Sequence, residues 1–279
     1  MTRTLCTLFD WAYHAKGLSL IASLRRHVPD LALYVLTLDD KTRDYFEDVT
    51  ITGVVPIALS EIETPELLTA KANRTRVEYI WTLASCFTHY CARMFNLSSV
   101  TYIDADCYLF GDLSPLYDEV AGCPVAITPH RYTPYQADRL KGAGVYNVGW
   151  TYFERAGYEC LVNWRNQCLQ WCYHQIMPDG RMADQGYLND WPQRWGAHEV
   201  YNLGVNLAPW NQEQYEYFIM DESFHRDRLM ISDGRRMDEL LMYHFHGFEG
   251  LKIRSGYPID PMIARYVYEP YEGEYAKWI

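Results

Sequence analysis

The sequence has little of what membrane-spanning, nucleic-acid-binding and disulfide-stabilised proteins need. No apolar run approaches the roughly 18 residues that a membrane span requires. Basic residues number 25 against 36 acidic ones, and the formal net charge of −11 argues against broad binding to nucleic acid or anionic membrane. None of the eight cysteines forms a Cys-x-x-Cys pair. We therefore expect reduced thiols in a cytoplasmic protein, and neither a zinc ribbon nor a disulfide framework.

Apolar and aromatic residues, in contrast, are abundant. Hydrophobic residues make up 49% of the 279 positions, and Phe, Trp and Tyr make up 15%. This composition can bury a large core and excludes a disordered chain. Neither an internal repeat nor a low-complexity linker divides the sequence, so we expect a single domain over residues 1–279.

Apolar runs alternate with helical patterns through the first two thirds of the chain. This alternation implies right-handed crossovers and an α/β fold, with a mostly parallel sheet flanked by helices. Beyond Pro192 the pattern becomes less regular, and the tail after 254 has no clear periodicity. The expected strands are 5–9, 31–38, 54–59, 100–103, 124–128, 145–153 and 199–203, and the expected helices include 72–95, 158–175 and 184–191.

Two carboxylates, Asp104 and Asp106, directly follow the apolar strand expected at 100–103. Side chains two apart on an extended chain point the same way, and parallel sheets bind ligands beyond the carboxyl ends of their strands. Two hard oxygen ligands at such an edge suit a divalent cation that bridges to phosphate oxygens. An acidic, solvated turn is the alternative interpretation, because the Asp-x-Asp pattern is common.

Two histidines end the apolar run at 240–245. His244 and His246 alternate toward one face, and Gly247 after them permits close approach of the backbone. Neutral imidazole beside carboxylates suits Mn²⁺ better than Mg²⁺. The alternative is that one or both rings satisfy hydrogen bonds of the core or surface.

In their order along the chain, these motifs resemble those of nucleotide-sugar-dependent glycosyltransferases of the GT-A fold. The resemblance is greatest to the retaining group that includes glycogenin and the bacterial lipooligosaccharide galactosyltransferases. Thr7-Leu8-Phe9-Asp10 is similar to the family's first strand and nucleotide-binding turn, and Tyr102-Ile103-Asp104-Ala105-Asp106 to its metal-binding motif. Tyr146-Asn147-Val148-Gly149 resembles the strand beside the donor sugar, Asp184-Gln185 the Asp-Gln pair at the sugar, and His244-Phe245-His246-Gly247 with Lys252 the last conserved segment.

The resemblance implies transfer of a hexose from a nucleotide diphosphate sugar, most readily a UDP-sugar, with retention, to a glycan or glycolipid acceptor. Mn²⁺ (or Mg²⁺) would be held by Asp104, Asp106 and His244, with His246 as the alternative imidazole. Asp184 and Gln185 would act at the sugar. Residues up to about 113 would bind the nucleotide, about 114–253 the sugar and acceptor, and 254–279 would form a tail. The donor-binding residues implied are Phe9, Asp10, Asp104, Ala105, Asn147, Gly149, Gly247 and Lys252.

An acidic protein must supply local cations for a departing diphosphate. Arg74 and Arg76, at the start of the helix expected at 72–95, are candidates, with exposed surface charges as the alternative interpretation. Lys252 is a third candidate, although the family's Lys-Pro-Trp ending is replaced here by Lys252-Ile253-Arg254.

Three other functions remain open from the sequence. A non-catalytic carbohydrate-binding protein could use exposed Trp and Tyr, but it gives the carboxylates and histidines no role. A haloacid-dehalogenase-like phosphatase would carry its Asp-x-Asp near the N-terminus and would usually have Thr or Val where this chain has Tyr108. An inverting glycosyltransferase would need a carboxylate base, which sequence cannot place. The tyrosines of the tail could touch a membrane interface weakly, but neighbouring glutamates favour packing on the core.

Overall fold

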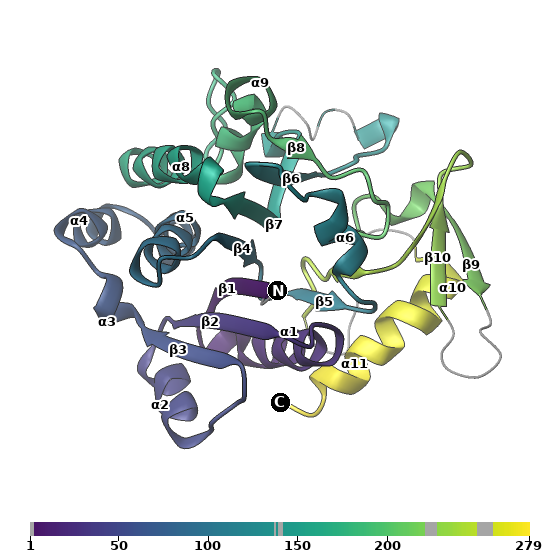
Figure 1. Cartoon of the computed structure of the whole chain (residues 1–279), viewed down its shortest axis with the longest axis horizontal. Helices are drawn as coiled ribbons and strands as arrows, with labels where there is room; N and C mark the ends of the chain where they lie inside the picture. Colours follow the sequence, from purple (N-terminus) through teal and green to yellow (C-terminus); the bar gives the residue numbers. More distant parts are fainter. Residues whose placement is uncertain (1–2, 137, 139–141, 221–227, 250–258) are drawn as a thin grey trace.

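The computed structural model describes residues 3–136, 138, 142–220, 228–249 and 259–279. Its centre is a seven-stranded sheet in the order β3-β2-β1-β4-β7-β6-β8 (Figure 1). Four neighbouring pairs are parallel, and only β7 runs antiparallel to its neighbours β4 and β6. The expected mostly parallel α/β fold is confirmed. The strands are β1 (Arg3–Phe9), β2 (Leu31–Thr37), β3 (Val54–Ala58), β4 (Ser99–Ile103), β6 (Val125–Pro129), β7 (Tyr146–Glu154) and β8 (His198–Glu199).

Helices cover both faces of this sheet. Strand β1 shows why, because its alternate residues enter two separate cores. Cys6 and Leu8 belong to the core shared with α5 (Arg76–Met94) and α8 (Tyr158–Gln170). Leu5 and Phe9 belong to the core shared with α1 (His14–His27). A strand buried on both faces reads as a continuous apolar run. The shorter helices are α2 (Asp40–Asp48), α3 (Leu59–Ile62), α4 (Pro65–Asn73), α6 (Ser114–Glu119) and α9 (Trp191–Trp195).

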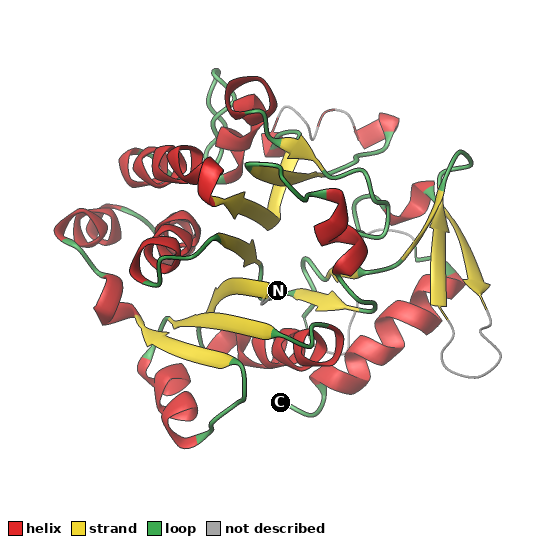
Figure 2. Ribbon diagram, viewed as in Figure 1, coloured by secondary structure: helices red, strands yellow, loops and turns green. Residues whose placement is uncertain are grey.

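Two small sheets lie beside the central one (Figure 2). Strand β5 (Cys107–Leu109) pairs antiparallel with β12 (Met242–His244), which sets His244 opposite Cys107. Strands β9 (Glu216–Met220), β10 (Arg228–Ser232) and β11 (Met237–Glu239) form an antiparallel sheet. The β5–β12 pair is the one that matters for function, because it joins the segment after β4 to the histidine segment.

The helix expected at 72–95 is α5, which begins at Arg76 and not at 72. Helix α4 ends at Asn73 and α5 begins at Arg76, with Thr75 between them. The Thr75 hydroxyl accepts the Glu78 N–H at 3.4 Å, and the Glu78 carboxylate accepts the Thr75 N–H at 2.9 Å. This reciprocal cap satisfies free N–H groups that a continuous helix would not have there, so α5 starts at the cap.

Three further expectations need correction. The helix expected at 158–175 ends at Gln170, where Trp171 takes an extended conformation, and the strand expected at 199–203 is only the two-residue β8. The helix expected at 184–191 is a 3₁₀ helix at Gln185–Asp190. Pro192 lies in the first turn of α9 and does not end a helix, because a proline there has no hydrogen bond to lose.

The C-terminal segment is helical, although its sequence showed no clear periodicity. It forms α10 (Pro261–Ile263), a π-helical turn at Ala264–Tyr268 and α11 (Glu269–Tyr275), which runs beside α1 in Figure 1. Tyr271 is fully buried, and its ring stacks on Phe245 with centroids 3.6 Å apart. The expectation that tyrosines of the tail pack on the core is therefore confirmed for this residue. All eight cysteines are free thiols, and no helix among the described residues is long and apolar enough to cross a membrane.

Candidate active site

A cavity of about 1250 Å³ opens at the carboxyl ends of β1 and β4. It lies where open parallel sheets bind ligands, because loops leave the strands there and backbone groups face outward. Most of the residues singled out from the sequence line it: Phe9, Asp10, Arg76, Asp104, Ala105, Asp106, Asn147, Asp184, Gln185, His244, His246 and Gly247.

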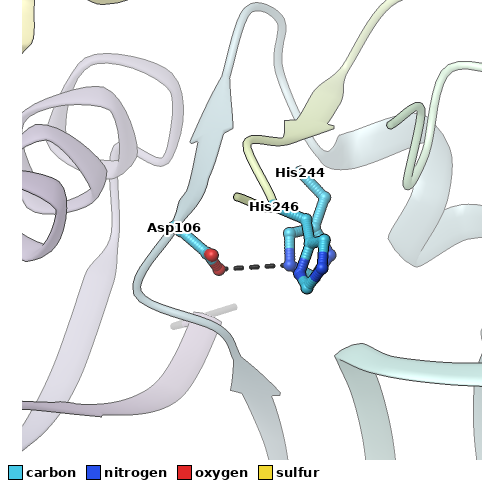
Figure 3. A group of neighbouring side chains, drawn as sticks. All are labelled: Asp106, His244 and His246. Atoms are coloured by element: carbon cyan, nitrogen blue, oxygen red, sulfur yellow. Dashed lines mark ion pairs between the residues drawn. The ribbon is translucent and has the colours of Figure 1, made fainter. Parts of the chain in front are cut away.

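Asp106, His244 and His246 form a cluster in this cavity (Figure 3). The antiparallel β5–β12 pair brings the two segments together, and the Phe245 N–H donates to the Asp106 carbonyl at 2.8 Å. One nitrogen or carboxylate oxygen from each residue lies within 4.8 Å of the others. His244 Nε2 is 3.1 Å from Asp106 Oδ1 and 3.8 Å from Asp104 Oδ2. Carboxylate oxygens and imidazole nitrogens at these separations can share one divalent cation.

Asp106 of this cluster and the neighbouring Asp104 differ in pKa because their partners differ. Burial favours the neutral acid in both, but His244 and its hydrogen bond hold the pKa of Asp106 below its ordinary value. Burial raises the pKa of Asp104, which lies farther from His244 and accepts the Tyr102 hydroxyl at 2.8 Å. Burial acts to lower the pKa of His244, yet the two carboxylates raise it. The site therefore attracts positive charge, as a cation site must.

Gly149 lies close to the His244 ring. A Cβ at position 149 would lie 2.6 Å from His244 Nδ1 and 2.5 Å from Asn147 Oδ1, so only glycine fits. The Gly149 N–H donates to Asn147 Oδ1 at 2.8 Å, and Asn147 Nδ2 lies 3.4 Å from His130 Nε2. Burial lowers the pKa of His130 to about 3. Through Asn147 and Gly149, strand β7 thus lies next to the rings of His130 and His244.

Arg74 and Arg76 have different surroundings. The Arg76 guanidinium reaches the cavity and donates to Asp10 Oδ2 through Nη2 at 2.6 Å and Nε at 3.1 Å. Arg74 is not among the cavity-lining residues. Its guanidinium donates to the Thr82 hydroxyl and, at 2.7 Å, to the Leu169 carbonyl, which ties α5 to α8. Lys252, the third candidate cation, lies outside the described residues.

Asp184 and Gln185 border the cavity on the side of α8 and α9. Gln185 Nε2 donates to the Ala143 carbonyl at 2.8 Å, and the Asp184 carbonyl accepts the Trp164 indole N–H at 3.0 Å. The Asp184 residue is 6% exposed. Burial, together with the charge of Asp104, raises its pKa to about 8. The buried Asp184 carboxyl therefore favours its protonated form more than an exposed aspartate does.

Sequence reasoning missed one wall of the cavity. Val77, Ile80, Trp81 and Ala84 follow helical spacing on α5, and a stripe of this kind is typical of a core-facing helix. Here all four line the cavity, and the Val77 side chain is largely exposed. Local spacing shows that a face is apolar, but it does not distinguish a core from an open cavity.

None of the known protein-family models matches the sequence. The chain is 30% identical to the uncharacterized protein YfnD of Bacillus subtilis (strain 168), over 98% of this chain and 88% of that protein. Among solved structures, the galactosyltransferase LgtC in complex with donor and acceptor sugar analogs gives a TM-score of 0.61 at 16% identity, over 99% of this chain and 96% of LgtC. Mouse xyloside xylosyltransferase 1 gives 0.53 at 13% identity, over 93% of this chain and all of that one. The chain therefore has the GT-A fold expected from its motifs, and it belongs to the same protein family as YfnD.

Proposed function

We propose that the chain is a metal-dependent glycosyltransferase that moves a hexose from a nucleotide diphosphate sugar, a UDP-hexose, to a glycan or glycolipid acceptor with retention of configuration. The observation that carries this proposal is that one cavity gathers Asp104, Asp106 and His244 with Asp184 and Gln185. The GT-A fold of the chain, shared with a galactosyltransferase and a xylosyltransferase, supports the reaction class.

The donor set fits a divalent metal. Two carboxylates provide hard oxygens, and His244 provides a borderline nitrogen, which favours Mn²⁺ over Mg²⁺. In this proposal Asp104, Asp106 and His244 hold the ion, and His246 is the alternative imidazole. A bound ion would neutralise charge on the diphosphate as it leaves.

The remaining residues would position the donor. In the transfer, the bond between the anomeric carbon and the diphosphate breaks while the bond to the acceptor oxygen forms. Phe9, Asp10 and Ala105 are assigned to the nucleotide, and Arg76 and Lys252 to negative charge on the diphosphate. Asp184 would hydrogen-bond donor-sugar hydroxyls, and Gln185 would lie near the anomeric carbon.

Retention is proposed because the order of motifs resembles that of the retaining group of GT-A glycosyltransferases. The proposal also keeps the division of the chain into a nucleotide-binding part up to about 113, a sugar and acceptor part to about 253, and a supporting C-terminal tail. We place the enzyme in the cytoplasm, in keeping with eight free cysteines.

Thermal unfolding in the presence of nucleotides tests the proposal. UDP, GDP, CMP and dTDP are each added with Mn²⁺ or with EDTA, and Asp106→Asn is the matched control variant. A ligand at about 100 times its Kd adds roughly 2.7 kcal/mol of stability. We expect UDP to raise Tm only with Mn²⁺ and only in the wild type. If no nucleotide stabilises the protein in either condition, a non-catalytic carbohydrate-binding protein becomes the better interpretation.

A further inference from the structure

Asn206 is a buried asparagine beside the metal cluster, in the loop between β8 and β9. Asn206 is fully buried. Its backbone φ of 59° lies in the left-handed region, which few residues other than glycine adopt. Its side-chain Oδ1 is 3.3 Å from His244 Nδ1. No sequence motif singles it out, because Asn in a turn-rich segment is ordinary loop chemistry.

The backbone holds this loop against the histidine strand. The His244 N–H donates to the Leu207 carbonyl at 2.8 Å, and Leu207 forms a parallel bridge with Tyr243. Asn211 closes the loop from the other side, because its Nδ2 donates to the Asn206 carbonyl at 3.1 Å. The Asn206 amide therefore keeps a fixed place beside the imidazole.

A hydrogen bond at this position decides which imidazole nitrogen is free. An amide oxygen only accepts, so His244 Nδ1 must carry the hydrogen that it donates to Asn206. Nε2, which donates to Asp106 Oδ1 at 3.1 Å, is then the nitrogen at which a metal would replace the hydrogen. A Cβ at position 149 would come within 2.8 Å of Nδ1 and Cε1 of the ring, and Trp210 meets the ring edge-on with centroids 5.2 Å apart. The ring thus has little room to turn its nitrogens around.

We infer that Asn206 is a positioning residue that fixes His244 in the Nδ1–H form, with Nε2 directed at the metal position beside Asp106. The inference rests on the metal site of the proposed function. One feature of Asn206 is unfavourable for the fold alone: its buried Nδ2 group has no hydrogen-bond partner within the described part of the chain. An acceptor oxygen aimed at His244 gives the buried amide a reason.

Mn²⁺ affinity, measured from the free-ion EPR signal without nucleotide, tests this role in four proteins. Asn206→Gly keeps a residue that tolerates positive φ and removes the acceptor. Asn206→Asp keeps an acceptor oxygen in the same place. Asn96→Gly is the matched control, because Asn96 also has positive φ, 48°, but lies outside the cavity. Tm in EDTA, measured for each protein, reports folding separately from metal binding.

We expect Asn206→Gly to weaken Mn²⁺ binding about 10- to 100-fold, the range typical of residues that orient a metal ligand. Asn206→Asp should restore affinity to within a few-fold of the wild type, and Asn96→Gly should leave it unchanged. Wild-type affinity in Asn206→Gly would overturn the inference and leave the metal site standing. So would equal loss in the Asp variant, because an acceptor would then not be what matters. Absence of Mn²⁺ binding in the wild type would overturn both the inference and the metal-dependent proposal.

Discussion

His244 and His246 are two residues apart but have different surroundings. His244 is 3% exposed and lies beside the carboxylates of Asp104 and Asp106. His246, in contrast, is exposed at the edge of the cavity. A buried imidazole between two carboxylates loses little freedom on binding a cation, and an exposed one loses more. This asymmetry favours His244, the imidazole that the resemblance assigns to the metal, over the alternative, His246.

We predict that His244→Ala weakens Mn²⁺ binding by at least about 10-fold more than His246→Ala does. Isothermal titration calorimetry with MnCl₂ measures both affinities, and Tm in EDTA shows whether either variant has lost its fold. The reverse order of affinities would transfer the ligand role to His246.

Asp184→Asn is predicted to separate stability from activity. The folded state keeps the Asp184 proton up to a pKa of about 8, well above its ordinary value of 3.8, chiefly because the carboxyl is buried. Between these two values the unfolded chain has released a proton that the folded protein retains, so Asp184 lowers stability as pH rises. The free energy of unfolding of the asparagine variant should therefore rise relative to that of the wild type. Between these two pKa values, the difference should grow by up to about 1.4 kcal/mol for each pH unit.

Urea unfolding of both proteins at pH 5, 6 and 7 measures this difference. At pH 7 the variant should also lose turnover while keeping UDP affinity, because Asp184 is assigned to the sugar and not to the nucleotide. A stability difference that does not change with pH would contradict the burial argument. Equal loss of turnover and UDP affinity would contradict the assignment to the sugar.

At the scale of elements, α5 has two apolar faces with different surroundings. Leu83 and Phe87 are fully buried in the core shared with α8, whereas Trp81 is partly exposed in the cavity and meets the His174 ring edge-on. The start of the helix is fixed by the Thr75–Glu78 cap, and the Glu78 carboxylate also accepts the His174 N–H at 2.8 Å. The Glu78 carboxylate therefore both caps the helix and holds the segment at His174, which also lines the cavity.

We predict that Trp81→Ala costs less than about 2 kcal/mol of stability, although it removes the larger side chain, while Leu83→Ala costs about 2–5 kcal/mol. Truncation beside an open cavity leaves no new void, whereas truncation in the core does. Urea unfolding measures both changes. In the nucleotide experiment Trp81→Ala should also reduce the UDP-dependent rise in Tm. Equal destabilisation by the two variants would place Trp81 in the core.

Local pattern predicted the elements around the site better than their ends. The strand before Asp104 and the strand that carries Asn147 are present as expected, because burial on both faces gives each of them a continuous run of five to nine mostly buried residues. The break between α4 and α5 was missed, although Thr75-x-x-Glu78 is a capping signal in the sequence. The apolar stripe begins at Val77, inside α5, and does not mark where the helix starts.

At the scale of the whole molecule, the C-terminal helices complete the histidine segment. Phe245, between His244 and His246, stacks on Tyr271 of α11, and Glu274 of the same helix pairs with Arg26 of α1 at 3.1 Å. Helix α11 is thus attached both to the segment that carries the two histidines and to α1. The position of that segment involves this packing.

We predict that Tyr271→Ala destabilises the protein by about 3–5 kcal/mol and also weakens Mn²⁺ binding, because Phe245 loses the ring that fixes it. Tyr266→Ala, on the same segment but only partly buried, should cost less than about 1 kcal/mol and leave Mn²⁺ affinity unchanged. Thermal unfolding and calorimetry with MnCl₂ measure the two effects. Unchanged Mn²⁺ affinity in Tyr271→Ala would show that β12 holds its place without the tail.

The sequence by itself determined the alternation of strands and helices, the carboxylates at the end of a buried strand, and the order of motifs that resembles GT-A glycosyltransferases. These features depend on neighbours within one strand or one turn of helix. Only the tertiary structure decided that Arg76 and not Arg74 faces the cavity, that the α5 stripe lines it, and that Asn206 meets His244. Such contacts join segments far apart in the chain, and they are set by side-chain packing between elements that no local periodicity encodes.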